Sequence, residues 1–319
     1  MAQPVLLFGG ASIGAEFRTA TDVRRALETA QRCGIGRIDT AARYPPPAPG
    51  QSEKLLGDVD VKRSGMVVDT KIMAAPPGAG SLAPAKIEES LLNSLASLRL
   101  DKVNVLYCHM PDYQTPLEEQ AAAFQEQFEK GRMAYLGVSN FTLEMLEQWM
   151  DICDKRGYIK PTYYQGQYNL FCRGSEEKLF PFLHKYKINF VGYSPLAGGF
   201  LTGKLTSGED LTASRFLAGN ALGAHFKMWY DKPSMHDAMM KMRVLAQEAD
   251  LTSSEMALRW VVHHSALKAD DGVILGASKT AQIESAVREV RRGPLPPELV
   301  GQLEALWDLV KADAPSVGV

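Results

Sequence analysis

The sequence predicts an α/β fold, a (β/α)8 TIM barrel whose active site lies at the C-terminal face of the strands. Eight short apolar runs alternate with longer amphipathic stretches, and several runs are apolar almost throughout. Strands of a parallel sheet that is covered on both faces have this composition. The length of 319 residues is common for one such barrel. We therefore expect residues 1–319 to form a single domain, although strand–helix alternation alone could also build an open doubly wound sheet.

The predicted strands cover residues 5–8, 36–39, 66–70, 103–109, 133–139, 162–165, 189–194 and 272–278. Between them, apolar residues recur at spacings of three and four, which places them on one face of a helix. Residues 87–98, 117–128 and 146–153 show this spacing clearly. Thr142 offers a cap before the third of these helices.

Two segments interrupt the alternation. Residues 45–52, PPPAPGQS, predict a loop because proline fixes φ and lacks an amide donor. Residues 201–233 form a long excursion after the seventh strand, and excursions of this length in compact domains are usually functional.

The composition of the chain indicates which kinds of binding partner are not expected. With 35 basic and 37 acidic residues, the net charge of −2 gives no electrostatic reason to expect a nucleic acid or an anionic membrane as partner. The four cysteines form no CxxC pair and predict neither a zinc site nor a disulfide framework. The first residues lack the pattern of a signal peptide, and no run approaches the roughly 20 apolar residues of a membrane span. We expect a cytoplasmic monomer or homodimer that acts on a small molecule and holds no metal.

Four polar residues lie where predicted strands end. Asp39 ends the second strand, Lys71 follows the third and His109 ends the fourth, while Tyr44 lies in the loop that leaves Asp39. Because the C-terminal ends of barrel strands open onto one face, we expect these side chains to converge. Taken singly, each residue is more often a packing, capping or solvated group, and their joint placement is what favours a site.

These residue types suit proton donation coupled to hydride transfer. A carbonyl that accepts hydride develops an alkoxide, which must be protonated or held by donors. Tyr44 can supply the proton, and the ammonium of Lys71 is expected to lower the pKa of that phenol. Asp39 can hold Lys71, and a neutral His109 can orient the carbonyl oxygen. The sequence has no P-loop, no GxGxxG after a first strand, no GxSxG and no HExxH.

Eight motifs resemble those of the aldo-keto reductases, and most closely the aflatoxin-aldehyde reductase branch. They are DTAARY (39–44), GQSE (50–53), DTKI (69–72), LYCHMPD (106–112), GVSN (137–140), YQGQYN (164–169), YSPLAGGFLTGK (193–204) and VILGAS (273–278). The resemblance implies an NADPH-dependent reductase of aldehydes or ketones that uses Asp39, Tyr44, Lys71 and His109 as its catalytic tetrad.

The resemblance also implies how a dinucleotide would be held. Ser139, Asn140 and Gln165 would bind the nicotinamide, with the ring of Tyr193 stacked beneath it. The pyrophosphate would meet Ser194, Pro195, Leu196 and Gly198, the cations Lys204 and Arg215, and the closing segment 201–233. Gly276, Ser278, Lys279 and Gln282 would lie at the adenosine end. Ala286 and Gln282 replace an Asn and an Arg that are common in the family, which weakens the expected preference for NADPH over NADH, although Lys279 can pair with a 2′-phosphate.

The substrate pocket is expected to be apolar, with few polar groups. Its predicted walls are Met110, Tyr113, Phe226, Met228, Trp229 and Tyr230, and Arg173 is expected to face a substrate carboxylate. The alternatives are that the apolar residues only pack the excursion and that Arg173 forms an ion pair. Two other functions also stay open: a biosynthetic reductase or dehydrogenase for one specialised metabolite, and a nicotinamide-sensing binding protein without turnover. An intact tetrad favours an enzyme over a sensor.

Overall fold

Eight parallel strands close into a barrel in chain order, with β8 paired to β1. The computed structural model describes residues 3–74, 80–211, 214–217 and 219–315. The strands are β1 Val5–Gly9, β2 Arg37–Asp39, β3 Val67–Lys71, β4 Val103–Cys108, β5 Met133–Ser139, β6 Tyr163–Gln167, β7 Asn189–Tyr193 and β8 Gly272–Gly276. The predicted TIM barrel is confirmed, and the open sheet is excluded.

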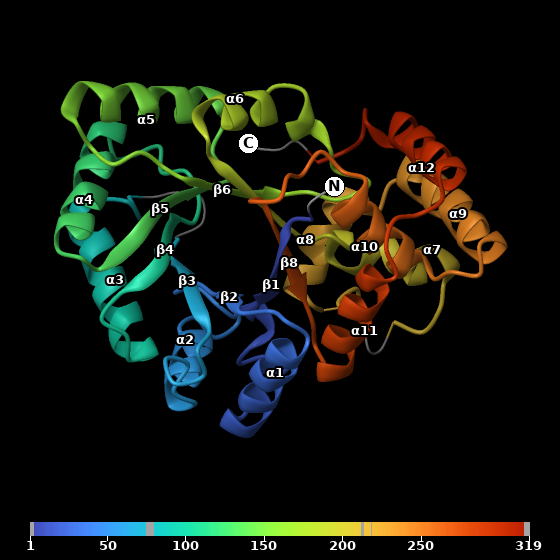
Figure 1. The fold of residues 1–319 in the computed structure, drawn as a ribbon, viewed down its shortest axis with the longest axis horizontal. Helices are drawn as coiled ribbons and strands as arrows, with labels where there is room; N and C mark the ends of the chain where they lie inside the picture. Colours follow the sequence, from blue (N-terminus) through green and yellow to red (C-terminus); the bar gives the residue numbers. More distant parts are fainter. Residues whose placement is uncertain (1–2, 75–79, 212–213, 218, 316–319) are drawn as a thin grey trace.

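Helices follow one another around the strands (Figure 1). The surrounding helices are α1 Ala20–Arg32, α2 Gln51–Asp58, α3 Pro84–Leu98, α4 Leu117–Glu129, α5 Leu143–Arg156, α6 Leu179–Tyr186, α10 Ser253–His263 and α11 Thr280–Arg291. Helices α7 Lys204–Ser207, α8 Ala221–Tyr230, α9 Pro233–Glu248 and α12 Pro297–Val310 add to them. Short 3-10 turns are η1 Gly10–Ser12, η2 Gly174–Glu176 and η3 Ala197–Thr202. The predicted cap is confirmed, because the Thr142 side chain accepts a hydrogen bond from the Met145 amide at the start of α5.

Two predicted loops contain helix. Helix α2 begins at Gln51, inside the segment 45–52, because Gly50 adopts a φ of 83° and turns the chain directly after the prolines. The excursion 201–233 contains α7 and α8 rather than an extended loop. Asn220 caps α8 through the Gly223 amide, and Phe226 and Tyr230 bury the same face of this helix.

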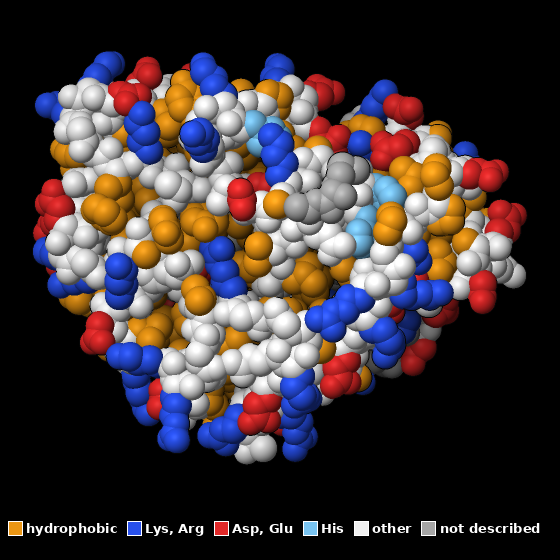
Figure 2. All heavy atoms as spheres, in the orientation of Figure 1, with side chains coloured by type: hydrophobic (Ala, Val, Ile, Leu, Met, Phe, Trp, Pro, Cys, Tyr) orange, Lys and Arg blue, Asp and Glu red, His pale blue; other side chains and the backbone are white. Residues whose placement is uncertain are grey.

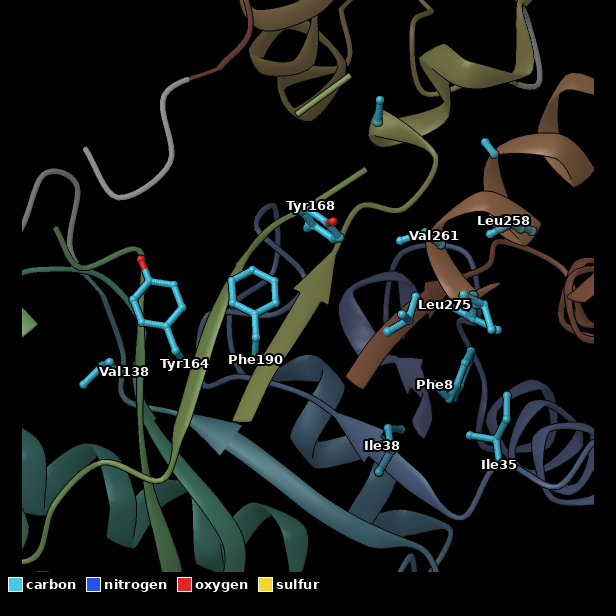
Figure 3. Close-up of a cluster of buried hydrophobic side chains, with 14 of the residues drawn as sticks. Phe8, Ile35, Ile38, Val138, Tyr164, Tyr168, Phe190, Leu258, Val261 and Leu275 are labelled. Carbon is cyan, nitrogen blue, oxygen red and sulfur yellow. The ribbon is translucent and has the colours of Figure 1, made fainter. Parts of the chain in front are cut away.

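The main core contains side chains from both the strands and the surrounding helices, among them Tyr164 of β6, Phe190 of β7 and Trp149 of α5. In Figure 3 the rings of Tyr164 and Phe190 lie side by side, with centroids 5.8 Å apart and planes 15° apart. A smaller apolar cluster of Leu7, Val191 and Ile274 is separate from it. On the face seen in Figure 2, charged side chains lie mainly along the outline and apolar ones gather toward the middle. No helix within the described ranges is long and apolar enough to cross a bilayer.

Strands β2 and β3 carry two ion pairs. Arg37 Nε lies 2.6 Å from Asp69 Oδ2, and Lys71 Nζ lies 2.7 Å from Asp39 Oδ1. Side chains two residues apart on a strand share one face, so both pairs lie on the same side of these strands. Asp39 and Lys71 are the last residues of β2 and β3, so their ion pair lies at the C-terminal ends of the strands, where the sequence predicts the active site.

Candidate active site

Lys71 is held by three acceptors in the protein interior. Its Nζ donates hydrogen bonds to both carboxylate oxygens of Asp39, each at 2.7 Å, and to the Thr40 carbonyl at 2.8 Å. The Gln165 amide also donates to Asp39 Oδ1, at 2.8 Å. Burial lowers the pKa of Lys71, but the Asp39 carboxylate and the Tyr44 phenol raise it, and the net direction is upward. Lys71 is therefore a fixed, charged ammonium.

Tyr44 lies between Lys71 and His109. Its ring centroid is 4.8 Å from Lys71 Nζ and 5.6 Å from the His109 ring, which meets it edge-on at 88°. Burial and the Asp39 charge raise the pKa of Tyr44, whereas Lys71 and Arg215 lower it, and the net direction is upward. The expected lowering by Lys71 is present, but burial, which replaces water around the phenol with protein atoms, outweighs it. The phenol is protonated at neutral pH, which is the form that a proton donor needs.

His109 is neutral and has an unused ring nitrogen. Burial lowers its pKa far below the usual value, and the charges of Lys71 and Arg43 lower it further. Its Nδ1 is buried and has no hydrogen-bond partner in the described part of the chain. Because such groups are normally paired, this nitrogen indicates a place for a polar ligand atom.

The four residues expected to hold a nicotinamide belong to the same hydrogen-bonded network. Asn140 Nδ2 donates to Ser139 Oγ at 3.0 Å and to the His109 carbonyl at 3.2 Å. The Tyr193 hydroxyl donates to Asn140 Oδ1 at 2.9 Å. Gln165 is the strand neighbour of Ser139 and donates to Asp39, so the network runs from β2 to β7.

The segment after β7 bends sharply. Ser194, Ala197 and Gly198 have φ values of 56°, 51° and 67°. At Gly198 an added Cβ would lie 2.4 Å from the Phe226 ring, so only glycine fits there. Pro195 and Leu196 complete this bend. Leu196, with φ −103° and ψ 21°, is followed by Ala197 in the left-handed region, and such a pair of conformations can turn adjacent amides toward one side, a shape that suits an anion.

The residues predicted for the adenosine end lie together at the start of α11. Gln282 Oε1 accepts hydrogen bonds from the Ser278 amide at 2.7 Å, the Ser278 hydroxyl at 3.0 Å and the Lys279 amide at 3.1 Å. Gly276 ends β8 opposite Gly9. The Gln282 oxygen thus already uses the donors that an anion would meet at this helix end.

The two predicted cations differ in setting. Lys204 is exposed at the start of α7. The Arg215 guanidinium lies 5.5 Å from the Phe226 ring centroid, and its charge acts on Tyr44 and Glu16. Arg215 therefore also contributes to the electrostatics of the phenol.

The residues predicted to line the substrate pocket differ in their exposure, and not all of them are available to a substrate. Phe226 is buried, Met110 and Trp229 are half-buried, and Tyr113 is 68% exposed. Tyr230 is fully buried, and its hydroxyl accepts hydrogen bonds from Gln167 Nε2 at 2.5 Å and Asn169 Nδ2 at 3.0 Å. It anchors α8 to the barrel and offers no surface to a substrate.

Arg173 lies in an ion-pair cluster. It bonds Glu176 and Glu304, and its guanidinium lies 4.8 Å from the Trp260 ring centroid. The structure therefore supports the alternative interpretation, in which Arg173 forms ion pairs within the protein. Its guanidinium already has carboxylate partners and needs none from a substrate.

Sequence reasoning missed two residues that support the site. The Thr40 carbonyl accepts from Lys71, and a backbone acceptor leaves no side-chain signal. Asn169 Nδ2 lies 3.0 Å from both the Ser194 carbonyl and the Tyr230 hydroxyl. Asn169 could have been predicted, because Gln165, Gln167 and Asn169 are polar residues at every second position. Positions with this spacing share one face of an extended chain.

Behind Lys71 lies a second buried carboxyl. Glu53 is 2% exposed, and its Oε1 accepts a hydrogen bond from Thr70 Oγ1 at 2.5 Å. Burial raises the pKa of Glu53 to about 7, although Thr70, Ser94 and Lys71 act in the opposite direction. Glu53 therefore changes its charge near neutral pH.

We expect the stability that Glu53 contributes to fall as pH rises. A folded pKa above the ordinary 4.5 means that the folded chain binds this proton more tightly than the unfolded chain. The contribution is complete below pH 4.5 and is lost as pH rises through about 7. The difference corresponds to about 3 kcal/mol. Urea unfolding of the wild type and Glu53→Gln across this range should show the wild type losing stability relative to the variant, and parallel curves would contradict it.

Comparison with known proteins places this geometry in context. The model of the aldo/keto reductase family matches residues 5–308. An aldo-keto reductase of Pseudocercospora fijiensis is 36% identical over 90% of this chain and 98% of its own. Human aldo-keto reductase family 7 member A3 is 33% identical over 99% of this chain and 97% of its own, and human aflatoxin B1 aldehyde reductase member 2 is 34% identical over 93% and 84%. The chain belongs to the aldo/keto reductase family of NAD(P)H-dependent oxidoreductases.

Proposed function

We propose that the chain reduces aldehydes or ketones to alcohols with NADPH, and that Tyr44 donates the proton. The observation that carries this proposal is the buried ammonium of Lys71, fixed by Asp39 and 4.8 Å from the Tyr44 ring. The nicotinamide, when bound, supplies the hydride to the carbonyl carbon. The carbonyl oxygen takes the proton of the Tyr44 hydroxyl, which leaves a phenolate beside Lys71.

Each tetrad residue has a separate task. The Lys71 charge stabilises the phenolate that forms, which offsets the effect of burial on the phenol. Asp39 keeps Lys71 charged and in place. A neutral His109 donates a hydrogen bond from a ring nitrogen to the carbonyl oxygen and thereby orients the substrate.

The surrounding residues fit a dinucleotide. Ser139, Asn140 and Gln165 offer polar groups to a carboxamide, and Tyr193 offers a ring. The bend formed by Ser194, Pro195, Leu196 and Gly198 offers amides to phosphate, with Arg215 and Lys204 as cations. Gly276, Ser278 and Gln282 would lie at the adenosine end, where the Lys279 ammonium can pair with a 2′-phosphate but gains nothing from a bare ribose. This favours NADPH over NADH.

The side chains offered to a substrate are apolar. Met110, Tyr113, Phe226 and Trp229 supply aromatic and thioether groups, which favour aryl or bulky carbonyl compounds over small charged ones.

Two titrations followed by a substrate screen test the proposal. We expect NADPH to quench the tryptophan fluorescence at lower concentration than NADH, and NADPH to be oxidised when a nitrobenzaldehyde is added. Tight binding without turnover of any carbonyl in a broad panel would point to a sensing protein instead. Turnover of one specialised carbonyl alone would indicate a biosynthetic enzyme. Equal affinity for the two cofactors would overturn the preference for NADPH.

A further inference from the structure

The first turn of α2 contacts the side chains of Thr40 and Thr70, which adjoin Asp39 and Lys71, and the carbonyl of Tyr44. This turn contains the GQSE motif, of which Ser52 and Glu53 are 0% and 2% exposed. Neither residue is among those that would touch substrate or cofactor. Buried polar side chains are retained only where their hydrogen bonds are satisfied, so their partners indicate what they hold.

Ser52 joins the ends of β1 and β2 to the loop that carries Tyr44. Its hydroxyl donates to the Gly10 carbonyl at 3.0 Å and shares a hydrogen bond of 2.9 Å with Thr40 Oγ1. Its amide donates to the Tyr44 carbonyl at 3.1 Å. Thr40 follows Asp39 and gives its carbonyl to Lys71. The Ser52 side chain thus holds Gly10 and Thr40, whose carbonyl binds the ammonium, while the Ser52 amide holds the residue that carries the phenol.

Glu53 holds the next strand from its outer side. Its carboxyl accepts from the hydroxyl of Thr70, the residue before Lys71 in β3. Adjacent side chains on a strand point to opposite faces, so Thr70 faces α2 while Lys71 faces Asp39. The hydrogen bond therefore ties the strand that carries the ammonium to the helix that Ser52 ties to Tyr44.

We propose that Ser52 and Glu53 are positioning residues, which set the distance between the Tyr44 phenol and the Lys71 ammonium by fixing the backbone from which both project. The proposal rests on the proposed function of Tyr44. A displacement of about 1 Å at a reacting group can cost on the order of 100-fold in rate, so the effect is measurable without loss of the fold.

The first test is Ser52→Ala, with Lys54→Ala as the matched control on the exposed side of the same turn. We expect kcat for NADPH-dependent carbonyl reduction to fall about 10- to 100-fold in Ser52→Ala, while KM and the NADPH affinity change by less than about threefold. Lys54→Ala should match the wild type. In a Tyr44→Phe background the Ser52 effect should shrink to less than about threefold, because residues that act through one group are not additive. If Ser52→Ala lowered kcat by the same factor in the wild-type and Tyr44→Phe backgrounds, the loss would not act through Tyr44, and the proposal would be overturned.

The second test compares Glu53→Gln with Glu53→Leu. Glutamine keeps an acceptor for Thr70 and should keep kcat within about threefold of the wild type. Leucine has a similar size, but it leaves the Thr70 hydroxyl without its acceptor and should lower kcat about 10-fold or more. Equal activity of the two variants would remove Glu53 from the proposal.

A third readout does not depend on turnover. Carbon-13 NMR of the tyrosine phenol carbons, with Tyr44 assigned by Tyr44→Phe, reports the pKa of Tyr44 directly. In Ser52→Ala this pKa should rise, because the phenol loses part of its contact with the Lys71 charge. If the wild type reduces no carbonyl and the pKa of Tyr44 still rises in Ser52→Ala, the proposed function is refuted and the positioning role is kept. An unchanged titration would overturn the positioning role whatever the activity.

Discussion

Tyr44→Phe is expected to lower kcat by a factor of about 100 to 10,000 and to leave the NADPH dissociation constant within about twofold. The variant keeps the ring that packs against His109 and Lys71, and loses only the hydroxyl that gives its proton to the forming alkoxide. Steady-state oxidation of NADPH with an aryl aldehyde measures the first quantity. Fluorescence titration measures the second.

Tyr135→Phe is the matched control for this experiment. It removes a hydroxyl from the same residue type on β5, outside the candidate site, where the side chain is 47% exposed. We expect wild-type kcat and KM. If Tyr44→Phe also kept wild-type kcat, the proton would come from another group and the assignment of the acid would be wrong.

Asp39→Leu is expected to destabilise the fold by about 3–5 kcal/mol and to abolish measurable turnover. The variant leaves the buried Lys71 ammonium with the Thr40 carbonyl alone and leaves the Gln165 amide without its carboxylate acceptor. Removing one partner of a buried ion pair leaves an uncompensated charge, which accounts for the size of the loss. Urea unfolding at neutral pH measures the change in stability.

A second substitution distinguishes charge from packing. Lys71→Met in the Asp39→Leu background removes the unpaired charge and should recover most of the lost stability, because buried pairs can be replaced by apolar groups at little cost. Activity should stay lost in the double variant. If Lys71→Met recovered no stability, the loss in Asp39→Leu would reflect packing, and the ammonium would not be the source of the cost.

The sequence predicted the strands of the barrel to within a few residues at each end. The reason is physical: strands covered on both faces must be apolar almost throughout, and their helices must repeat every three to four residues. Asp39, Lys71 and His109 were expected to converge because parallel strands end on one face. The Asp39–Lys71 ion pair and the contacts of Tyr44 with Lys71 and His109 agree with that expectation.

Other features depend on three-dimensional burial that no local pattern contains. The net rise in the pKa of Tyr44 comes from protein atoms supplied by distant segments. The partners of Arg173 include Glu304, which is 131 positions away, so a cation expected to meet substrate is already paired. Helix α8 was not predicted, because among its described side chains the buried apolar ones are Phe226 and Tyr230, too few to give a clear helical repeat.

The two ion pairs between β2 and β3 also constrain how these strands can align. Asp39 is paired with Asp69 in the strand register, and each carboxylate reaches a cation two residues farther along or back. Sliding one strand by a single residue would turn one member of each pair to the outer face. Sliding by two in one direction would place Asp39 opposite Val67, which would move it away from Lys71 and move Asp69 away from Arg37. The ion pair beside the proton donor, together with its neighbour, thus also makes misaligned pairing of β2 and β3 less favourable while the barrel folds.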